Sequence, residues 1–344
     1  MATAWIGTYT HFNGKPTGSR GIYRVTVTPE GFSDAALVAE AANPTYLGLS
    51  GDGRYLFAAL ETEEMNEAGQ SIFGGGVASY AITGDALSCL GVQSAGSRGT
   101  CHVSEHDGHV VAANYTDGTV SIFRHEDGRL SPRTALLVHS GEGPDSSRQA
   151  GAHAHFAHMS PWGELCVADL GIDKIMRYAP GSWAFRGYAA MAPGSGPRHL
   201  AFAGKLACAI GEMSSTVEVF TASGATWQQK QTLPTLPEGF AGASTCAAVR
   251  LSPDGRFLVV SNRGHDSLAV FSIADEALTP VGIFPCGGRE PRDFAFTPDG
   301  GFIVCGLQYD DQLALLSFDA STGNIADTQR RIDVPMPVCI AFHA

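Results

Sequence analysis

The sequence predicts an all-β protein, a seven-bladed β-propeller in which four antiparallel strands form each blade. Three observations support this prediction. A hairpin pattern recurs along the chain, further strands with alternating apolar residues follow the hairpins, and the two ends of the chain each hold part of one more blade. Together they predict one domain that covers residues 1–344.

The recurring unit is an apolar strand, a turn that resembles Ser-Pro-Asp-Gly and a second apolar strand, which is the pattern of a tight hairpin. Its copies lie roughly 40 to 55 residues apart, a period typical of propeller blades. Two of the turns, at 107–108 and 203–205, are shorter than the others. The six copies cover residues 44–60, 101–114, 155–169, 198–212, 247–262 and 292–308.

A third strand follows the hairpins and is marked by alternating apolar residues. The clearest examples cover residues 76–82, 119–123, 216–220 and 267–271. A fourth, more irregular strand follows each of them. Four antiparallel strands at this period describe blades that stack around a channel, with the first strand innermost.

The two ends of the chain complete the ring. Residues 3–10 have the pattern of a second strand and residues 21–27 that of a third, whereas residues 337–343 form a first strand without a hairpin partner. Combined, they predict a seventh blade that protects otherwise open strand edges. An open solenoid or a two-sheet sandwich does not explain a blade that is divided between both ends.

The composition limits the classes of function. Hydrophobic residues make up 44% and charged residues 16% of the chain, as expected for a folded core rather than disorder. A net charge of −12 argues against a nucleic-acid partner. No secretion signal or membrane-spanning stretch is recognisable, so we expect a cytoplasmic protein without a membrane partner. The eight cysteines are widely spaced and are expected to be free core thiols.

Strand phase places the polar residues at one end of the channel. Because the first and second strands form a hairpin, the start of one and the end of the other emerge together. An arginine and histidine cluster at this mouth of an acidic protein would suit a carboxylate or phosphate ligand. The alternative is that the arginines form structural bridges between blades. The expected mouth residues are His102, His155, Arg198, His199, Arg292, Asp293, Glu61, Asn114, Asp169, Glu212, Arg263, His265 and Gln308.

Several phrases of the sequence resemble the seven-bladed lactonase family, which comprises 6-phosphogluconolactonases and related carboxymuconate cyclases. They are IGTYT at 6–10, AHAHFAHMSP at 152–161, VADLGIDKI at 167–175, GPRHLAF at 196–202, EMSSTVEVF at 212–220, LSPDGRFLVVSNRGHDSLAVF at 251–271, EPRDFAFTPDG at 290–300 and PMPVCIAF at 335–342. The resemblance implies hydrolysis of 6-phospho-D-glucono-1,5-lactone to 6-phosphogluconate, a step of the pentose phosphate pathway, without a cofactor. The matching polar positions are His155, Arg198, His199, Glu212, Arg263 and Arg292.

Hydrolysis of a lactone needs a base for water, a positive group for the developing oxyanion and anchors for the rest of the substrate. We expect Glu212 or His155 to be the base, and the sequence leaves this choice open. His199 and Arg198 are expected to polarise the carbonyl group. The expected substrate-binding residues are Arg263 and Arg292 for the phosphate, together with His265, His102 and Asp169.

Other chemistries are less well supported. On a strand, His158 would point away from His153 and His155, so no metal site is expected. No GxSxG motif indicates a serine nucleophile. Two alternatives stay open: another lactone enzyme, either an unphosphorylated sugar lactonase or a carboxymuconate cyclase, and a binding propeller without catalysis. Segments 61–76 and 138–151 are expected to emerge at the mouth and to determine specificity.

Overall fold

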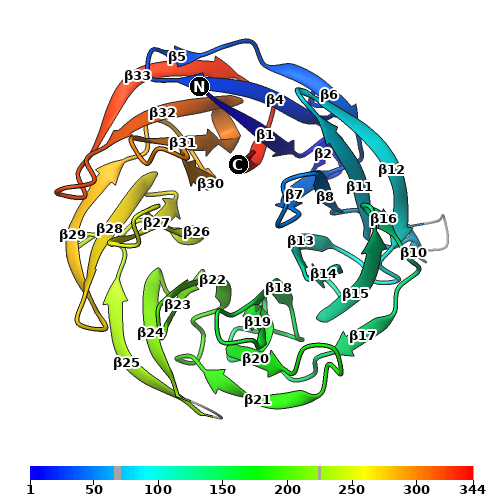
Figure 1. Cartoon of the computed structure of the whole chain (residues 1–344). Coiled ribbons are helices and arrows are strands. Elements are labelled where there is room, and N and C mark those ends of the chain that lie inside the picture. Colours follow the sequence, from blue (N-terminus) through cyan, green and yellow to red (C-terminus); the bar gives the residue numbers. More distant parts are fainter. Residues whose placement is uncertain (66–70, 224–225, 344) are drawn as a thin grey trace.

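The computed structural model describes residues 1–65, 71–223 and 226–343 and confirms a seven-bladed propeller (Figure 1). The blades surround a central channel, and in each of them the strands follow one another from the channel outward. Blade 2 comprises β7 (Pro44–Leu49), β8 (Tyr55–Leu60), β11 (Gly76–Thr83) and β12 (Ala86–Ser94), and blade 3 comprises β13 (Thr100–His106), β14 (His109–Asn114), β15 (Thr119–Glu126), β16 (Arg129–Leu130) and β17 (Ala135–Val138).

The next four blades continue in the order of the sequence. Blade 4 comprises β18 (Ala154–Met159), β19 (Leu165–Asp169), β20 (Lys174–Tyr178) and β21 (Phe185–Ala190), and blade 5 comprises β22 (Pro197–Ala203), β23 (Leu206–Gly211), β24 (Thr216–Ser223) and β25 (Thr226–Pro234). Blade 6 comprises β26 (Thr245–Leu251), β27 (Phe257–Arg263), β28 (Ser267–Ala274) and β29 (Ala277–Pro285), and blade 7 comprises β30 (Pro291–Phe296), β31 (Phe302–Leu307), β32 (Gln312–Phe318) and β33 (Ile325–Asp333).

Blade 1 is built from both ends of the chain, as the sequence predicts. Its innermost strand pairs antiparallel with the first strand of the chain, so that Ile6 lies opposite Ile340. Both side chains are buried, which fixes the register of the closing pair. The strands of blade 1 are β34 (Pro337–Phe342), β1 (Ala2–Thr8), β4 (Gly21–Thr28), β5 (Gly31–Phe32) and β6 (Ala36–Glu40).

Short elements connect the second and third strands within four of the blades. Two small hairpins pair β2 (His11–Phe12) with β3 (Lys15–Pro16) and β9 (Glu64–Met65) with β10 (Ser71–Phe73). Two 3₁₀ turns, η1 (Leu170–Ile172) and η2 (Gln308–Asp310), follow the second strands of blades 4 and 7. The tip of the β2–β3 hairpin, with Phe12 and Asn13, lies at the mouth of the channel.

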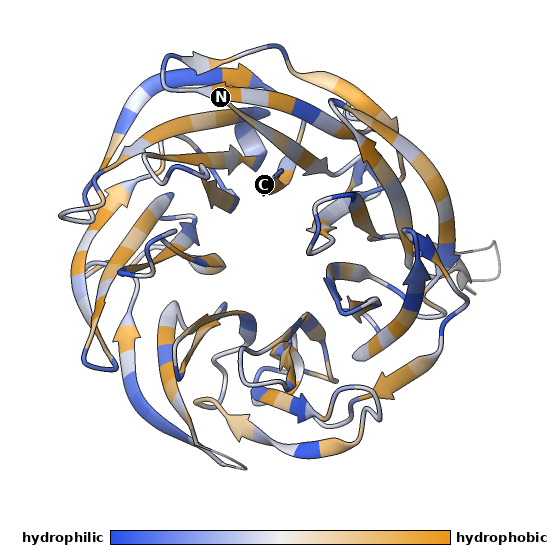
Figure 2. Cartoon of the chain, in the orientation of Figure 1, coloured by the Kyte–Doolittle hydropathy of each residue, from blue (hydrophilic) through white to orange (hydrophobic). Residues whose placement is uncertain are grey.

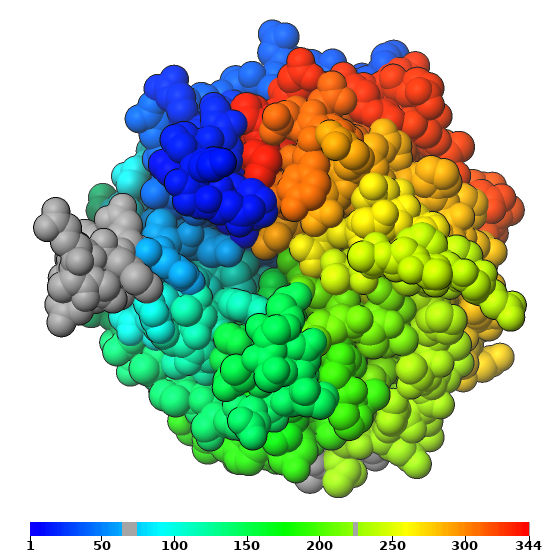
Figure 3. All heavy atoms as spheres, turned by 180° about the vertical axis from the view of Figure 1, so that it is seen from behind, coloured from blue at the N-terminus to red at the C-terminus, as the bar shows by residue number. Residues whose placement is uncertain are grey.

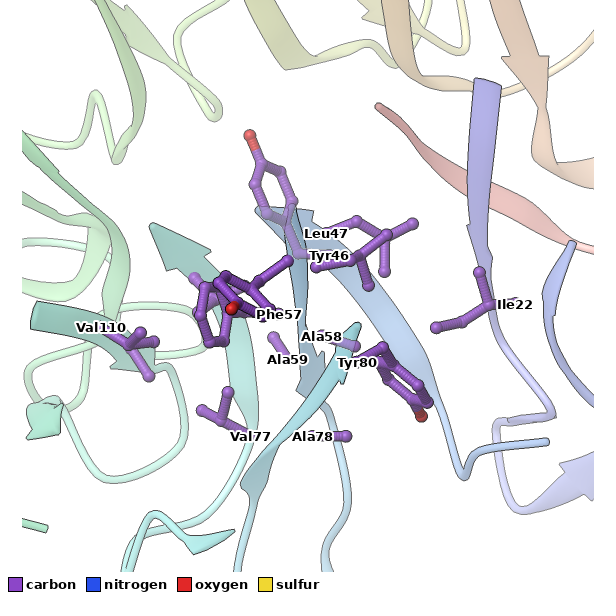
Figure 4. Close-up of a cluster of buried hydrophobic side chains, with 14 of the residues drawn as sticks. Ile22, Tyr46, Leu47, Phe57, Ala58, Ala59, Val77, Ala78, Tyr80 and Val110 are labelled. Atoms are coloured by element: carbon purple, nitrogen blue, oxygen red, sulfur yellow. The ribbon is translucent and has the colours of Figure 1, made fainter. Parts of the chain in front are cut away.

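The core lies between neighbouring blades. The inner strands are largely apolar, whereas the outer strands alternate between apolar and polar residues (Figure 2). Blade 2 shows the arrangement: Phe57 and Val110 lie on the side of blade 3, and Ile22 of blade 1 lies on the other side (Figure 4). Because an inner strand is covered on both faces, its sequence is a continuous apolar run, as in residues 55–60. All eight cysteines are free, seven of them buried and Cys89 exposed.

Each innermost strand carries a β-bulge near its first residues. In β18, for example, Ala154 faces Asp169 and Phe156 faces Ala168, which leaves His155 as the extra residue. A bulge interrupts the alternation of a strand and redirects its side chains. The corresponding positions of the seven blades, which we call the mouth ring, are Thr45, Cys101, His155, Arg198, Ala247, Arg292 and Val338.

The residues directly after the bulge form a second ring, which we call the plug ring: Tyr46, His102, Phe156, His199, Ala248, Asp293 and Cys339. Its aromatic members contact one another, with ring centroids 4.2 Å apart for Tyr46 and His102 and 4.4 Å apart for His102 and Phe156. Residues of both rings line one cavity of about 10 Å³. The plug ring therefore separates the two mouths of the channel.

Candidate active site

A cavity of about 590 Å³ lies at the mouth where the first strands begin. Figure 3 shows this face, with the blue N-terminal segment and a green segment from the middle of the chain on opposite sides of the central hollow. Four arginines and two glutamates line the cavity, so its charge is positive although the whole chain is acidic. The lining residues are Phe12, Asn13, Glu61, Cys101, Tyr115, Arg148, His155, Arg198, Glu212, Thr245, Arg263 and Arg292.

Glu212 is the centre of the charge network in this cavity. One of its oxygens, Oε2, lies 2.8 Å from Nε of Arg198 and 3.2 Å from Nη2 of Arg263, and Oε1 lies 2.6 Å from Nη2 of Arg148. Burial by itself would raise the pKa of Glu212, but Arg263, Arg198 and His155, followed by Arg148, hold it well below its usual value. Glu212 is thus a permanent anion that orients arginines, and it is a poor acceptor for a proton.

Arg198 is the most enclosed of these arginines, with 3% of its side chain exposed. Besides its bond to Glu212, it donates to the backbone oxygen of Ala247 and approaches Nε2 of His199 at 3.3 Å. Burial, assisted by the charge of Arg263, lowers the pKa of Arg198 to about 10. The guanidinium therefore remains charged at neutral pH and is held in one orientation.

A second polar cluster lines the opposite wall. The Tyr9 hydroxyl donates to Oε1 of Glu61 at 2.9 Å, and Arg292 donates through Nη2 to the same hydroxyl at 2.9 Å. Thr45 donates to Oε2 of Glu61 at 2.8 Å. Burial raises the pKa of Tyr9 far above its usual value, so this hydroxyl stays protonated. The cluster fixes Arg292 while leaving it on the cavity wall.

His155 lies between these clusters. Burial lowers its pKa well below the ordinary value, and the Arg198 charge lowers it further, so the imidazole is neutral at neutral pH. Its Nδ1 is buried and has no hydrogen-bond partner in the part of the chain that the structure describes. Tyr115 stands against it, with ring centroids 5.6 Å apart. A neutral imidazole with a free nitrogen is a competent proton acceptor.

The plug ring contains three residues that the sequence places at the mouth, His102, His199 and Asp293. His199 lines the small cavity beneath, and its ring lies 5.4 Å from that of His155. His102 packs between Tyr46 and Phe156 and lines the cavity at the other end of the channel. We expected four histidines at this mouth. For His102 and His199 this is wrong, because the bulge turns their side chains into the channel below the mouth ring.

Two further predicted substrate ligands lie outside the cavity. Asp169 is fully buried, accepts a hydrogen bond of 2.6 Å from Nδ1 of His139 and caps η1 by accepting from the Gly171 amide. Nδ1 of His265 forms a hydrogen bond of 2.7 Å with the Ser267 hydroxyl, and its ring packs on that of Phe240. Both side chains support neighbouring loops. Of the predicted mouth residues, the structure thus brings together Glu61, His155, Arg198, Glu212, Arg263 and Arg292.

The sequence-based selection lacks three residues that line this site or support it: Arg148, Tyr115 and Tyr9. Arg148 belongs to the segment predicted to emerge at the mouth, but a single arginine in a loop carries no pattern that marks it. The other such segment, 61–76, includes residues 66–70, which lie outside the described residues. Within residues 1–65, 71–223 and 226–343, no three His, Cys, Asp or Glu side chains converge as metal ligands.

The chain is similar to known proteins along almost its whole length. A family model described as Lactonase, 7-bladed beta-propeller, matches residues 3–342, so the chain belongs to this family. It is 34% identical to 6-phosphogluconolactonase of Bacillus subtilis, over 98% of this chain and 97% of the relative. The periplasmic gluconolactonase of Pseudomonas aeruginosa has a similar structure, with a TM-score of 0.90 and 31% identity over 100% of this chain and 99% of that one.

A protein from Lactobacillus plantarum has a similar structure as well, with a TM-score of 0.89 and 31% identity over 99% of both chains. Each of these likenesses extends around the whole ring. Among the described residues, no helix combines the length and the apolar character needed to cross a bilayer.

Proposed function

We propose that this protein hydrolyses the ring ester of a sugar lactone, and that its substrate is 6-phospho-D-glucono-1,5-lactone, which it converts to 6-phosphogluconate. The observation that carries the proposal is a neutral His155 beside the fixed guanidinium of Arg198 in a cavity of positive charge. The named relatives support the chemistry, since one is a 6-phosphogluconolactonase and another a gluconolactonase. The proposed reaction belongs to the pentose phosphate pathway and therefore to the cytoplasm.

His155 is the proposed general base. It accepts a proton from water as the water oxygen bonds to the lactone carbonyl carbon, and the carbonyl oxygen becomes an oxyanion. The bond between this carbon and the ring oxygen then breaks. The proton on His155 moves to the departing ring oxygen, which becomes a hydroxyl, and the carboxylic acid that forms releases the second proton of the water to solvent and becomes a carboxylate. Water is consumed and no covalent enzyme intermediate forms.

Arg198 is the proposed partner of the oxyanion. A charge that is already oriented in a water-poor site stabilises a developing anion without reorganisation. Glu212 and Ala247 fix the guanidinium of Arg198. His199 contacts Arg198 rather than the cavity mouth, so we assign it a positioning role through Arg198.

Arg263 and Arg292 are the proposed anchors for the anionic part of the substrate. Both line the cavity, one from blade 6 and one from blade 7. Arg263 is shared between Glu212 and Glu290, whose Oε1 lies 3.7 Å from its Nη1. Guanidinium groups bind phosphate oxygens in pairs, which suits this task.

Lactone hydrolysis at slightly acidic pH, where spontaneous opening is slow, tests the proposal. The substrates are phosphorylated and unphosphorylated gluconolactone, each with and without EDTA. We expect the phosphorylated lactone to be preferred and His155→Ala to lose roughly 10²- to 10⁴-fold in kcat. Glu212→Gln is expected to lose activity as well, because it frees the arginines. Full activity in both variants would refute this site.

The same assay separates the alternatives. A preference for the unphosphorylated lactone would indicate a gluconolactonase like the Pseudomonas aeruginosa relative. Turnover of a muconate lactone in place of both sugars would indicate a cyclase. Binding without turnover of any lactone would indicate a propeller that only binds its ligand.

A further inference from the structure

We infer that Arg148 is a third phosphate-binding residue beside Arg263 and Arg292, and that it strengthens the preference for a phosphorylated lactone over an unphosphorylated one by leaving Glu212 to bind the phosphate. This inference rests on the proposed function and adds a residue that no match to the family's motifs selects. Arg148 lies on the connection between blades 3 and 4 and lines the cavity at its outer edge.

Exposure sets Arg148 apart from the other two arginines on Glu212. Its side chain is 40% exposed, compared with 3% for Arg198 and 11% for Arg263. A half-exposed guanidinium can change partner at low cost because water solvates it on the way. The two enclosed guanidiniums have no such route, so Arg148 is the arginine of this cluster that can move.

Glu212 tolerates this movement. Arg148 bonds to Oε1, whereas Arg198 and Arg263 both bond to Oε2. When Arg148 turns away, the buried carboxylate still has two guanidinium partners and is not left as an uncompensated charge. Removing Arg198 or Arg263 instead would disturb a buried pair. The network thus holds one exchangeable cation and two fixed ones.

The backbone beneath Arg148 is rigid, so the movement is confined to the side chain. The next residue, Gln149, is fully buried and donates through Nε2 to the Leu170 oxygen at 2.8 Å and to Oδ1 of Asp173 at 2.9 Å. Asp145 accepts from the backbone amides of Arg148, at 3.1 Å, and Ser147, at 2.8 Å. The segment therefore presents Arg148 at a constant place above the cavity.

The position of Arg148 matches the shape of the proposed substrate. Arg148 and Arg198 lie on the two oxygens of one carboxylate, with Arg198 enclosed and Arg148 at the rim. In 6-phospho-D-glucono-1,5-lactone the carbonyl carbon and the carbon that carries the phosphorylated CH₂ group flank the ring oxygen, so the carbonyl oxygen and the phosphate diverge from nearby positions of the ring. A lactone whose carbonyl group contacts the enclosed Arg198 therefore places its phosphate on the other side of the same carboxylate, at the rim. Arg148 meets it there with a planar set of donors that suits phosphate oxygens.

The test compares the two gluconolactones in wild type, Arg148→Ala and Arg148→Lys. For Arg148→Ala we expect kcat/KM for the phosphorylated lactone to fall roughly 10- to 100-fold, mainly through KM. The loss on the unphosphorylated lactone should be at least about tenfold smaller. Arg148→Lys keeps the charge but not the paired donors, so its loss should be intermediate. Equal losses on both lactones, or none, would overturn the inference.

Arg289→Ala is the matched control. Arg289 is an exposed arginine that precedes β30, pairs with Asp310 and does not line the cavity. Binding of 6-phosphogluconate and of gluconate, measured by calorimetry, separates this inference from the proposed function, because it requires no turnover. Wild type should bind the phosphorylated acid more tightly, and Arg148→Ala should reduce that preference roughly 10- to 100-fold. If wild type shows no preference, Arg148 does not bind phosphate, whatever the outcome of the activity assay.

Discussion

The imidazole of His155 is neutral because of its burial and a nearby charge, neither of which the strand pattern reveals. Burial and the Arg198 charge both disfavour the imidazolium, so the pKa lies well below 6.5. The carboxylate of Glu212 opposes them but is already shared among three guanidiniums. Both candidate bases are therefore unprotonated at neutral pH, and we favour His155 because its Nδ1 has no hydrogen-bond partner among the described residues, whereas both oxygens of Glu212 are paired with arginines.

The rate should follow this protonation state. A base acts when it is deprotonated, so kcat/KM should stay constant as the pH falls from about 7.5 through 6.5 and decline only in more acidic solution, where His155 takes up a proton. The measurement is a pH profile of lactone hydrolysis, corrected for spontaneous opening. Glu212→Gln serves as the control, since it should keep the acidic decline at a lower rate. A midpoint at or above 6.5 would contradict the burial argument.

The bulges of the innermost strands decide which side chains reach the mouth. The hairpin pattern in the sequence correctly predicts the blades, their order and the end of the channel at which His155 and Arg198 emerge. It cannot predict depth, because a bulge adds one residue without changing the apolar pattern around it. For this reason Arg198 faces the cavity, while the next residue, His199, faces the plug ring.

Asp169 and His265 show a second limit of prediction from strand phase. Each stands at or just beyond the end of a second strand, where a side chain can enter either the mouth or the following turn. Asp169 turns to η1 and His139, and His265 turns to Ser267. Hydrogen-bond partners make this choice: Gly171 and Ser267 lie two residues further along the chain, whereas His139 comes from the preceding blade.

The connection between blades 3 and 4 should depend on Gln149. In Gln149→Ala the Leu170 oxygen and the Asp145 amide lose their buried side-chain partner, which should lower the free energy of unfolding by about 1–3 kcal/mol. KM for the phosphorylated lactone should rise, because Arg148 is no longer held above the cavity. Thermal unfolding, limited proteolysis of segment 139–151 and kinetics measure these effects.

The control for Gln149→Ala is Ser147→Ala in the same segment. Ser147 is exposed, and its hydroxyl donates to Asp145. We expect a change of less than about 0.5 kcal/mol. If both variants behave alike, the buried amide does not hold the segment.

At the scale of the whole molecule, stability depends on the closure of blade 1. Ile340 is 3% exposed and lies opposite Ile6 in the pair that joins the two ends of the chain. A charge placed there has no partner, so Ile340→Asp should cost about 3–5 kcal/mol and open the ring at this blade. Thermal unfolding and size-exclusion chromatography should show a lower Tm and association through the freed edges.

Gln228→Asp on the outer strand β25 is the matched control, because Gln228 is exposed and Lys230 is placed to form an ion pair with the new carboxylate. Its Tm should equal that of wild type. An unchanged Tm and a single monomer peak in Ile340→Asp would mean that six blades hold the ring without the closing pair.

The pairing of β34 with β1 also delays the completion of blade 1 during biosynthesis. A ribosome that adds roughly 5–20 residues per second needs about 20 to 70 seconds for the 344 residues of this chain. Throughout that time β1, already synthesised, lacks the strand that covers its channel side. The nascent chain therefore carries an open edge until β34 leaves the ribosome, and its yield in the cell should depend on how well chaperones shield that edge before the ring closes.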